Sequence, residues 1–259
     1  ADWEGFPQRK TTSARQGKRR GRGMAYYIEA CAGGAPENAR LEFSENKVRL
    51  LIGTQTNGQG HETAYRQILV ETLGISPDQI DVIQGDSAII KTGGGTGGSR
   101  SVPVGGAAVQ AVAETVIEKG KKIAAEMLEA AAADIDYQDG KFRIVGTDRT
   151  ATLFDVAAAG KQGVAKHDIQ GCLDSDAGFK PAASTFPNGC HIVEVEVDPE
   201  TGGITFDRYI ICDDFGRMIN PLLLEGQVHG GVVQGIGQAV SEATIYDPET
   251  GQLLTGSFM

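Results

Sequence analysis

The sequence predicts an α+β protein made of two units, each of which is a β-hairpin followed by a loop and a helix. Short runs of alternating apolar and polar residues between turn-forming residues are typical of strands, and longer runs with helical spacing are typical of helices. The stretches 41–73 and 193–240 follow the same order of elements, which suggests a structural duplication. We therefore expect two packed α+β units.

The first unit is expected to alternate between strands and helices. A helix over 62–73 ends before Gly74, since glycine favours the left-handed backbone at a helix C-terminus. Gln138-Asp139-Gly140 predicts the turn of a hairpin. The full set comprises strands over 23–30, 40–44, 47–54 and 80–84, helices over 62–73, 103–133 and 152–159, and a hairpin over 134–145.

The second unit repeats the plan at smaller size. Its expected elements are strands over 189–197 and 204–212, a turn over 198–203, a glycine-rich helix over 221–240 and a final hairpin around 247–251. The resulting domain boundaries are a connecting arm at 1–22, a first unit at 23–160, a linker at 161–185 and a second unit at 186–259. We expect the second unit to be truncated at its C-terminus.

Composition narrows the class of protein. A net charge of −10 argues against nucleic-acid binding, although seven of the fourteen residues from Arg9 to Arg22 are basic. That stretch is either a solvated arm or a polyanion-binding tail. No apolar run reaches the ~18 residues of a membrane span. A start without Met suggests a fragment or a processed chain.

The four cysteines are widely spaced and give no zinc or iron–sulfur pattern. They stand at positions 31, 172, 190 and 212, without a Cys-x-x-Cys pair. Scattered thiols fit a reducing compartment, so we expect a cytoplasmic protein. Any iron–sulfur centre in its chemistry would have to lie on another chain.

The first segment with chemical character is Gly58-Gln59-Gly60-His61-Glu62-Thr63, between a strand and a helix. Its glycines allow close approach of a ligand, and the following helix N-terminus offers unpaired N–H groups that suit an anion. Gln59 can both donate and accept hydrogen bonds, so it can bind a heterocycle edge. The segment is equally compatible with a tight strand–helix turn. His61 has no second His or Cys at metal-ligand spacing.

The second segment is the glycine-rich run 93–101, which contains a Gly-x-Gly-x-x-Gly pattern. A Rossmann site also needs an acidic residue at the end of a second strand about 20 residues later, and here that position falls inside a helix. The hydroxyls of Thr96, Ser99 and Ser101 beside Arg100 indicate a phosphate or pterin cradle instead. A flexible loop is the alternative.

The third segment runs from Ile219-Asn220-Pro221 through Glu225-Gly226-Gln227 to His229-Gly230-Gly231. Asn220 followed by Pro221 predicts a helix N-terminus. The predicted helix carries five glycines, and each costs about 1 kcal/mol relative to alanine. That cost predicts a close neighbour against the helix backbone, either another helix or a ligand.

Together the three segments resemble the second molybdopterin-binding region of the xanthine dehydrogenase and aldehyde oxidase family, most nearly its carbon monoxide dehydrogenase-like large subunits. Gly-Gln-Gly-His-Glu-Thr, Gly-Ser-Arg-Ser and Glu-Gly-Gln-Val-His-Gly-Gly stand here at 58–63, 98–101 and 225–231. The resemblance implies that molybdopterin cytosine dinucleotide, which carries the molybdenum, is the cofactor. The residues implied to contact it are Gly58, Gln59, Gly60, His61, Thr96, Gly98, Ser99, Arg100, Ser101 and Gln227.

The resemblance also implies the reaction and the partners. The reaction would be oxidative hydroxylation of an aldehyde, an N-heterocycle or CO, with oxygen from water. Electrons would leave through [2Fe–2S] centres and FAD on partner subunits. The complete enzyme would include the remaining lobe of the large subunit and assemble as a dimer of heterotrimers.

Two departures from the family pattern limit this inference. The family's catalytic base is a Glu in a Gly-Glu segment near the C-terminus, and no Gly-Glu dipeptide exists here. The family's first cofactor-binding lobe is also absent. We therefore assign no catalytic residue and no metal ligand, and expect no activity from the chain alone. The alternatives are a non-enzymatic assembly or oligomerisation module derived from such a subunit, and a stand-alone nucleotide-binding α/β protein.

Overall fold

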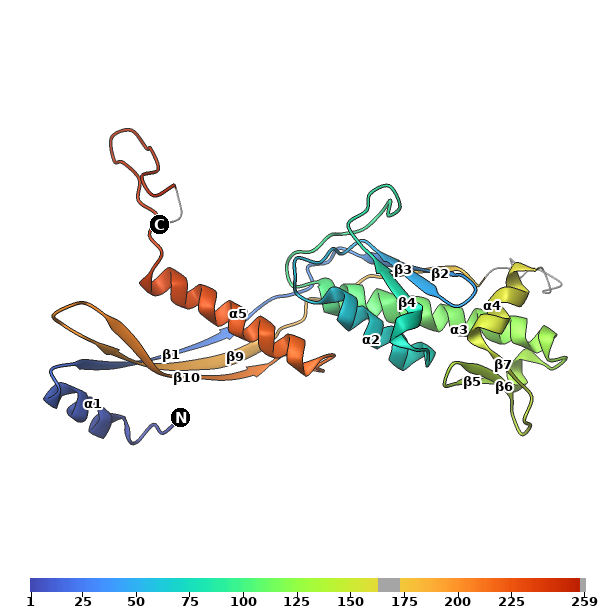
Figure 1. The fold of residues 1–259 in the computed structure, drawn as a ribbon, viewed down its shortest axis with the longest axis horizontal. Coiled ribbons are helices and arrows are strands. Elements are labelled where there is room, and N and C mark those ends of the chain that lie inside the picture. Colours follow the sequence, from blue (N-terminus) through green and yellow to red (C-terminus); the bar gives the residue numbers. More distant parts are fainter. Residues whose placement is uncertain (163–172, 257–259) are drawn as a thin grey trace. The chain divides into compact units, whose positions relative to one another are not determined.

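The fold, seen in a computed structural model that describes residues 1–162 and 173–256, has the predicted mixture of helices and strands (Figure 1). It divides into two compact units. Unit 1 consists of Ala1–Ile28 with Pro187–Met259, and unit 2 consists of Glu29–Phe186. Unit 2 is therefore inserted between the first strand of unit 1 and the remainder of unit 1.

The described residues of unit 2 form two sheets and three α-helices. The larger sheet consists of β2 (Glu37–Phe43), β3 (Val48–Ile52), β4 (Ile80–Ile83) and β8 (Ser175–Phe179). The smaller sheet consists of β5 (Ile135–Gln138), β6 (Lys141–Ile144) and β7 (Thr150–Thr152). The helices are α2 (His61–Leu73), α3 (Ala107–Met127) and α4 (Leu153–Lys161), with a π-helical turn over Ser101–Gly106 and 3-10 turns over Pro77–Gln79 and Ala132–Asp134.

The larger sheet of unit 2 has the order β4-β3-β2-β8, with β3 and β4 parallel and the other pairs antiparallel. Alternate residues of β2 are buried against the helices, and this row contains Ala39, Leu41 and Phe43. Each fully buried aliphatic side chain in this core contributes roughly 1.5–3 kcal/mol. The row begins with Glu37, a carboxylate that is also fully buried.

The parallel pair β3 and β4 fixes the position of the glycine-rich loops. The chain leaves β3, passes through α2 and returns in β4. Loops that follow the carboxyl ends of neighbouring parallel strands lie at the same edge of a sheet. The loop before α2 and the loop after β4 are therefore brought to one end of unit 2.

In unit 1, the residues that the structure describes form one sheet and two α-helices. Its strands are β1 (Arg19–Ile28), β9 (Asn188–Val197) and β10 (Ile204–Asp214), and its helices are α1 (Phe6–Arg15) and α5 (Pro221–Val240). β9 lies between β1 and β10 and is antiparallel to both. Asn220 caps α5 by accepting a hydrogen bond from the Leu223 N–H at 3.1 Å.

The division into units differs from the expected one in two places. The expected arm at 1–22 contains α1 and the first residues of β1, and β1 pairs with β9 rather than with a strand of the unit that follows it. The expected linker at 161–185 contains β8, which pairs with β2. In both cases the partner strand is more than a hundred residues away, so a local pattern does not reveal the pairing. Residues 163–172 of that linker lie outside the described residues.

Most other expected elements are confirmed within a few residues. α2 ends at Leu73, and Gly74 has the predicted left-handed conformation, with φ +61°. The hairpin of β5 and β6 turns at Asp139 and Gly140. The long helix is shorter than expected, because residues 101–106 are π-helical and the α-helix ends at Met127. Both units have the hairpin–loop–helix order, while the structural duplication stays a prediction. Among the described residues, no helix is long and apolar enough to cross a membrane.

Candidate functional site

The loop before α2 and the loop after β4 touch backbone to backbone. A side-chain carbon added at Gly53 would lie 2.3 Å from the Cα of Gly93, so glycine is required at this crossing. The Thr96 hydroxyl donates to the Gln55 carbonyl at 2.5 Å and ties the loops a second time. The structure thus brings together the first two segments that the sequence singled out.

The N-terminus of α2 is open to an anion. Gly60 is the N-cap, with φ +83°, and has no side chain to cap the helix. The N–H groups of residues 59–63 donate no hydrogen bond within the described part of the chain. Unpaired N–H groups and the positive end of the helix dipole favour negative charge. A side-chain carbon at Gly58 would meet no atom within 4 Å, so the approach is clear.

The second loop also presents unpaired N–H groups. Those of residues 95–99 donate no hydrogen bond to any described residue. Gly95, Gly98 and Ser99 have φ between +52° and +68°, and consecutive residues in such turns can form an anion-binding concavity. Ser99 is not glycine, so its left-handed backbone carries strain, which is often found at ligand sites.

The side chain of Gln59 is held by a chain of hydrogen bonds. Its Nε2 lies 2.9 Å from Nε2 of His61, and Nδ1 of His61 lies 2.9 Å from Oε1 of Gln84. With the Gln59 amide donating to Nε2 of His61, Nδ1 of the buried ring donates to Oε1 of Gln84. Nε2 of Gln84 is buried and has no partner. His61 therefore orients Gln59, and the buried, unpaired amide nitrogen of Gln84 is a group that a polar ligand would satisfy.

A buried hydrogen-bond network of hydroxyl groups joins the elements that carry the two loops. The hydroxyl of Tyr65 lies 2.8 Å from the Thr54 hydroxyl and donates to the Ser101 carbonyl at 2.9 Å. Burial raises the pKa of Tyr65 to about 12. The network joins β3, α2 and the π-helical turn, so it fixes the distance between the two loops.

Arg100 is buried in an ion pair. Nη1 donates to Oε2 of Glu37 at 2.7 Å and to the Gly95 carbonyl at 2.8 Å. Nη2 donates to the carbonyls of Ala35 and Pro36 at 3.0 and 2.8 Å. All four Nη hydrogens therefore have acceptors within the chain. The sequence assigned Arg100 to the cofactor, whereas these bonds commit its Nη groups to protein oxygens.

Sequence reasoning missed Glu37 as a functional candidate. The expected strand began at Arg40, so Glu37 was left outside the pattern. In the observed strand, Glu37 stands in the same alternating row as Ala39 and Leu41, on the buried face. A charged residue on the buried face of a strand indicates a structural or functional role. Strand boundaries that included Glu37 would have revealed this signal in the sequence.

Gln227 lies on α5 in unit 1, whereas the other predicted residues belong to unit 2. It is exposed, as is most of this helix. The five helix glycines were expected to have a close neighbour. Four of them, at 226, 230, 231 and 235, have open space where a side chain would stand, whereas Gly237 faces the Glu242 side chain.

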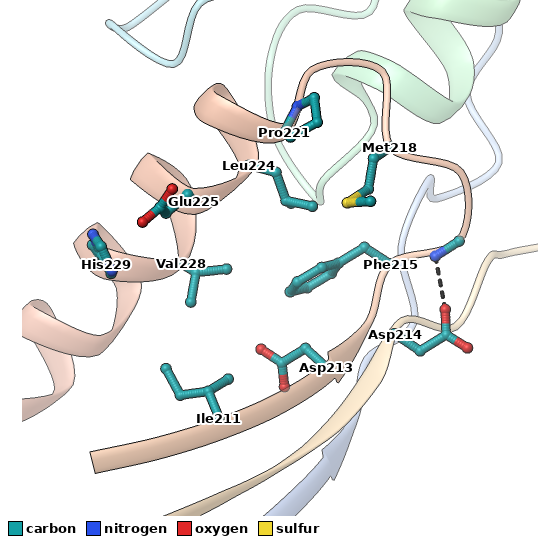
Figure 2. Close-up of a pocket in the computed structure, with 11 residues that line it drawn as sticks. Ile211, Asp213, Asp214, Phe215, Met218, Pro221, Leu224, Glu225, Val228 and His229 are labelled. Carbon is teal, nitrogen blue, oxygen red and sulfur yellow. Dashed lines mark hydrogen bonds between the residues drawn. The ribbon is translucent and has the colours of Figure 1, made fainter. Parts of the chain in front are cut away.

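Unit 1 has a cavity of about 540 Å³ between β10 and α5, and Gln227 does not line it. Figure 2 shows the carboxylates of Asp213 and Glu225 on opposite sides of this cavity, with the Phe215 ring between the strand and the helix. Asp213 also lies 3.2 Å from Nε2 of His191. Because carboxylates line it, this cavity does not suit an anionic ligand. Within the residues that the structure describes, no group of three or more His, Cys, Asp or Glu could hold a metal ion.

The unpaired N–H groups on the loops of unit 2 suit an anionic ligand, and comparison with known proteins identifies the family of the chain. A molybdopterin cofactor-binding domain model matches residues 1–259. The chain is 37% identical to the 6-hydroxypseudooxynicotine dehydrogenase complex subunit gamma of Paenarthrobacter nicotinovorans, over 94% of this chain and 31% of that protein. It is 38% identical to the carbon monoxide dehydrogenase large chain of Hydrogenophaga pseudoflava, over 80% of this chain and 26% of that protein.

Solved structures give the same result. The reconstituted CO dehydrogenase from Oligotropha carboxidovorans matches with a TM-score of 0.88 and 29% identity, over 98% of this chain and 34% of that chain. This chain belongs to the molybdopterin cofactor-binding domain family, in the carbon monoxide dehydrogenase-like branch of molybdenum hydroxylase large subunits. It spans about a third of the length of these relatives or less.

Proposed function

We propose that this chain binds molybdopterin cytosine dinucleotide within the large subunit of a molybdenum hydroxylase, and that the two loops of unit 2 form much of the cofactor cradle. The observation that carries the proposal is the set of unpaired N–H groups at residues 59–63 and 95–99, on loops that contact each other. Membership of the molybdopterin-binding family supplies the identity of the anion.

The chemistry of the loops fits this cofactor. Its phosphates would accept hydrogen bonds from backbone N–H groups near Gly60 and Gly98, and the open space at Gly58 and Gly98 permits close approach. Its pterin ring has donors and acceptors along its edges, which suit the Gln59 amide and the Ser99 and Ser101 hydroxyls. His61 would contribute by orienting Gln59. Gln227, on unit 1, is proposed as a further contact.

The bound cofactor would supply oxidative hydroxylation with oxygen from water. This chain's part would be to bind the cofactor, to orient it, and to keep Gln59 in one hydrogen-bonding state. We assign no proton-transferring residue here, because a general base must lie within reach of the reacting group and no Gly-Glu segment is present. The isolated chain should therefore show no turnover.

The partners follow from the same proposal. The named relatives are a gamma subunit of a complex and a large chain, so this chain would work beside the rest of a large subunit. Subunits carrying [2Fe–2S] centres and FAD would remove the electrons, in a dimer of heterotrimers. We propose a cytoplasmic location for this assembly, since the widely spaced cysteines of the sequence suit a reducing compartment.

A matched pair of glycine variants tests the cradle. Gly98 and Gly202 both have positive φ, +56° and +73°, and both have open space where a side chain would stand. Valine at either position carries backbone strain of about 1–3 kcal/mol. Only Gly98→Val should also block the cofactor. The two variants are made in the complete large subunit, and molybdenum is measured together with the CMP that acid hydrolysis releases from the cofactor.

We expect at least a tenfold loss of molybdenum and CMP in Gly98→Val, and normal content in Gly202→Val. Equal content in both variants would contradict the proposed cradle. Absence of molybdenum and CMP from the native complex would favour the alternative function, a non-enzymatic assembly module.

A further inference from the structure

The glycine-rich loop 93–99 has two halves with different surroundings. Added side-chain carbons at Gly93 and Gly94 would lie 2.3 Å from Gly53 Cα and from Arg100 Nη1, respectively. At Gly97 and Gly98, nothing lies within 4 Å. The first half is packed against protein atoms, and the second half faces open space. The packed half must therefore hold the open half in place.

We propose that Glu37 and Arg100 are positioning residues that clamp the packed half of this loop, so that the open half presents its N–H groups to the cofactor. The effect on cofactor binding rests on the proposed function. The clamp itself is a set of hydrogen bonds within the chain and does not depend on bound cofactor. Arg100 would act through the loop backbone and not by contact with a phosphate.

The clamp bonds both an N–H group and a carbonyl group of one short stretch of backbone, Gly94-Gly95. Oε2 of Glu37 accepts the Gly94 N–H at 3.0 Å, and Nη1 of Arg100 donates to the Gly95 carbonyl at 2.8 Å. The same two groups bond each other at 2.7 Å. Through Nη2, Arg100 is also anchored to the Ala35 and Pro36 carbonyls, just before β2. The loop is therefore tied to the end of a central strand of the sheet.

Because the clamp is buried, each of its two charged groups depends on the other for compensation. Glu37 is fully buried and Arg100 is 6% exposed, so removing one charge strands the other away from water. An uncompensated buried charge is far more costly than a broken surface pair. The same burial argues against a direct role for the Arg100 Nη groups, because the nearby Glu37 carboxylate would repel a phosphate and the Nη hydrogens are already used, although the buried Nε has no partner among the described residues.

Two backbone amides report the state of the loop without any cofactor. The Gly94 N–H bonds Glu37 directly. The Ala32 N–H donates to the Gly98 carbonyl at 2.9 Å, on the open half, and contacts neither clamp residue through a hydrogen bond. Its neighbour Cys31 donates to the Thr185 carbonyl at 2.8 Å and serves as a local control. Amide hydrogen exchange followed by NMR measures all three.

The variants are Glu37→Gln and, as a matched control on the same strand, Glu42→Gln, which loses partly exposed ion pairs with Arg40 and Arg49. We expect exchange at Ala32 and Gly94 to rise at least tenfold in Glu37→Gln, with α3 amides unchanged. Glu42→Gln should change none of them. If Glu37→Gln fails to fold, Arg100→Lys provides the test, since it keeps the charge and loses the planar fork.

Unchanged exchange at Ala32 would overturn the clamp, as would a rise of equal size at Ala32, Cys31 and α3, which would indicate general destabilisation. Molybdenum and CMP content of the same variants in the complete subunit tests the consequence. A loop released in Glu37→Gln with full cofactor content would leave the clamp standing and contradict the proposed cradle.

Discussion

The two units differ sharply in how their apolar residues are used. In the described part of the chain, every buried apolar residue belongs to unit 2, where the main core packs α3 and its neighbours against the larger sheet. Among its described residues, unit 1 buries only Ser13 and Glu194. Its helix α5 buries none of its residues, and Leu222 on that helix is 76% exposed.

This difference indicates two sources of stability. Unit 2 is stabilised by removal of apolar surface from water, whereas unit 1 depends on strand pairing and on charges. Arg9 and Arg20 bond the carboxylates of Glu194, Glu196 and Asp207 and so connect α1 with the sheet of unit 1. Ion pairs respond to salt and pH, so the two units should respond to different perturbations.

The largest expected difference comes from leucine truncation. Leu50→Ala in unit 2 should lower the free energy of unfolding by about 2–5 kcal/mol, because Leu50 is fully buried and its removal leaves a cavity. Leu222→Ala in unit 1 should change it by less than about 0.5 kcal/mol. Urea denaturation followed by circular dichroism measures both. Similar losses would mean that unit 1 has a core of its own in solution.

Alkaline pH should weaken unit 2 through Tyr65. Burial raises its folded pKa from 10.0 to about 12, so the folded state keeps a proton that the unfolded state releases. Stability is then fully present below pH 10 and falls as the pH rises through 12, by roughly 3 kcal/mol in total. Denaturation midpoints between pH 9 and 12 test this. Tyr65→Phe, which cannot ionise, should lose this part of the pH dependence and serves as the control.

Replacing a glycine by alanine should change the free energy of unfolding in opposite directions in the helices of the two units. In α3, a side-chain carbon at Gly120 would lie 2.2 Å from the Phe142 ring, so Gly120→Ala should destabilise unit 2 by about 1–3 kcal/mol. In α5, Gly226 has open space, so Gly226→Ala should stabilise the helix by up to about 1 kcal/mol. Thermal unfolding of both variants decides the signs. Destabilisation by Gly226→Ala would show that this face of α5 is covered in solution.

The smallest expected effect is in unit 1 at acid pH. Arg9 lowers the pKa of Glu194, and Arg20 lowers the pKa of Asp207. The stabilisation that these two ion-paired carboxylates give to unit 1 is present above the ordinary carboxyl pKa and is lost as the pH falls below it. Helix α1 should then detach more readily from the sheet of unit 1. Trp3, the single tryptophan, has the Arg22 guanidinium 3.3 Å from its ring centre, so its fluorescence should change first. An emission spectrum that is constant from pH 6 to 3 would contradict this.

Local patterns predicted most elements of the fold because their causes are local. The spacing of apolar residues defined α2, and Asn220 with Pro221 defined the start of α5. The strand β8 and the assignment of β1 could not be predicted, since they depend on partners far away in the sequence. Helix α1 was not predicted, because its stretch is rich in charged and polar residues and has little apolar periodicity.

The candidate site was predictable to a similar extent. The glycine loops could be found because glycine patterns and a helix N-terminus are visible in the sequence. Their mutual contact at Gly53 and Gly93 was not visible, nor was the partner of Arg100. An arginine beside hydroxyl residues favours a phosphate ligand until its carboxylate partner is known. The role of a charged residue depends on what the fold places next to it.

The insertion of unit 2 between β1 and β9 has a consequence for how the chain is made. Strand β1 ends at residue 28, and its partner β9 ends at residue 197, so β1 emerges from the ribosome long before its partner exists. At synthesis rates of about 5–20 residues per second, the wait is on the order of ten to thirty seconds. Unit 2 is complete within that interval and can fold first. During this time β1, whose backbone groups lack their partner strand and which carries the apolar side chains of Met24, Tyr26 and Ile28, is exposed to aggregation and to capture by chaperones.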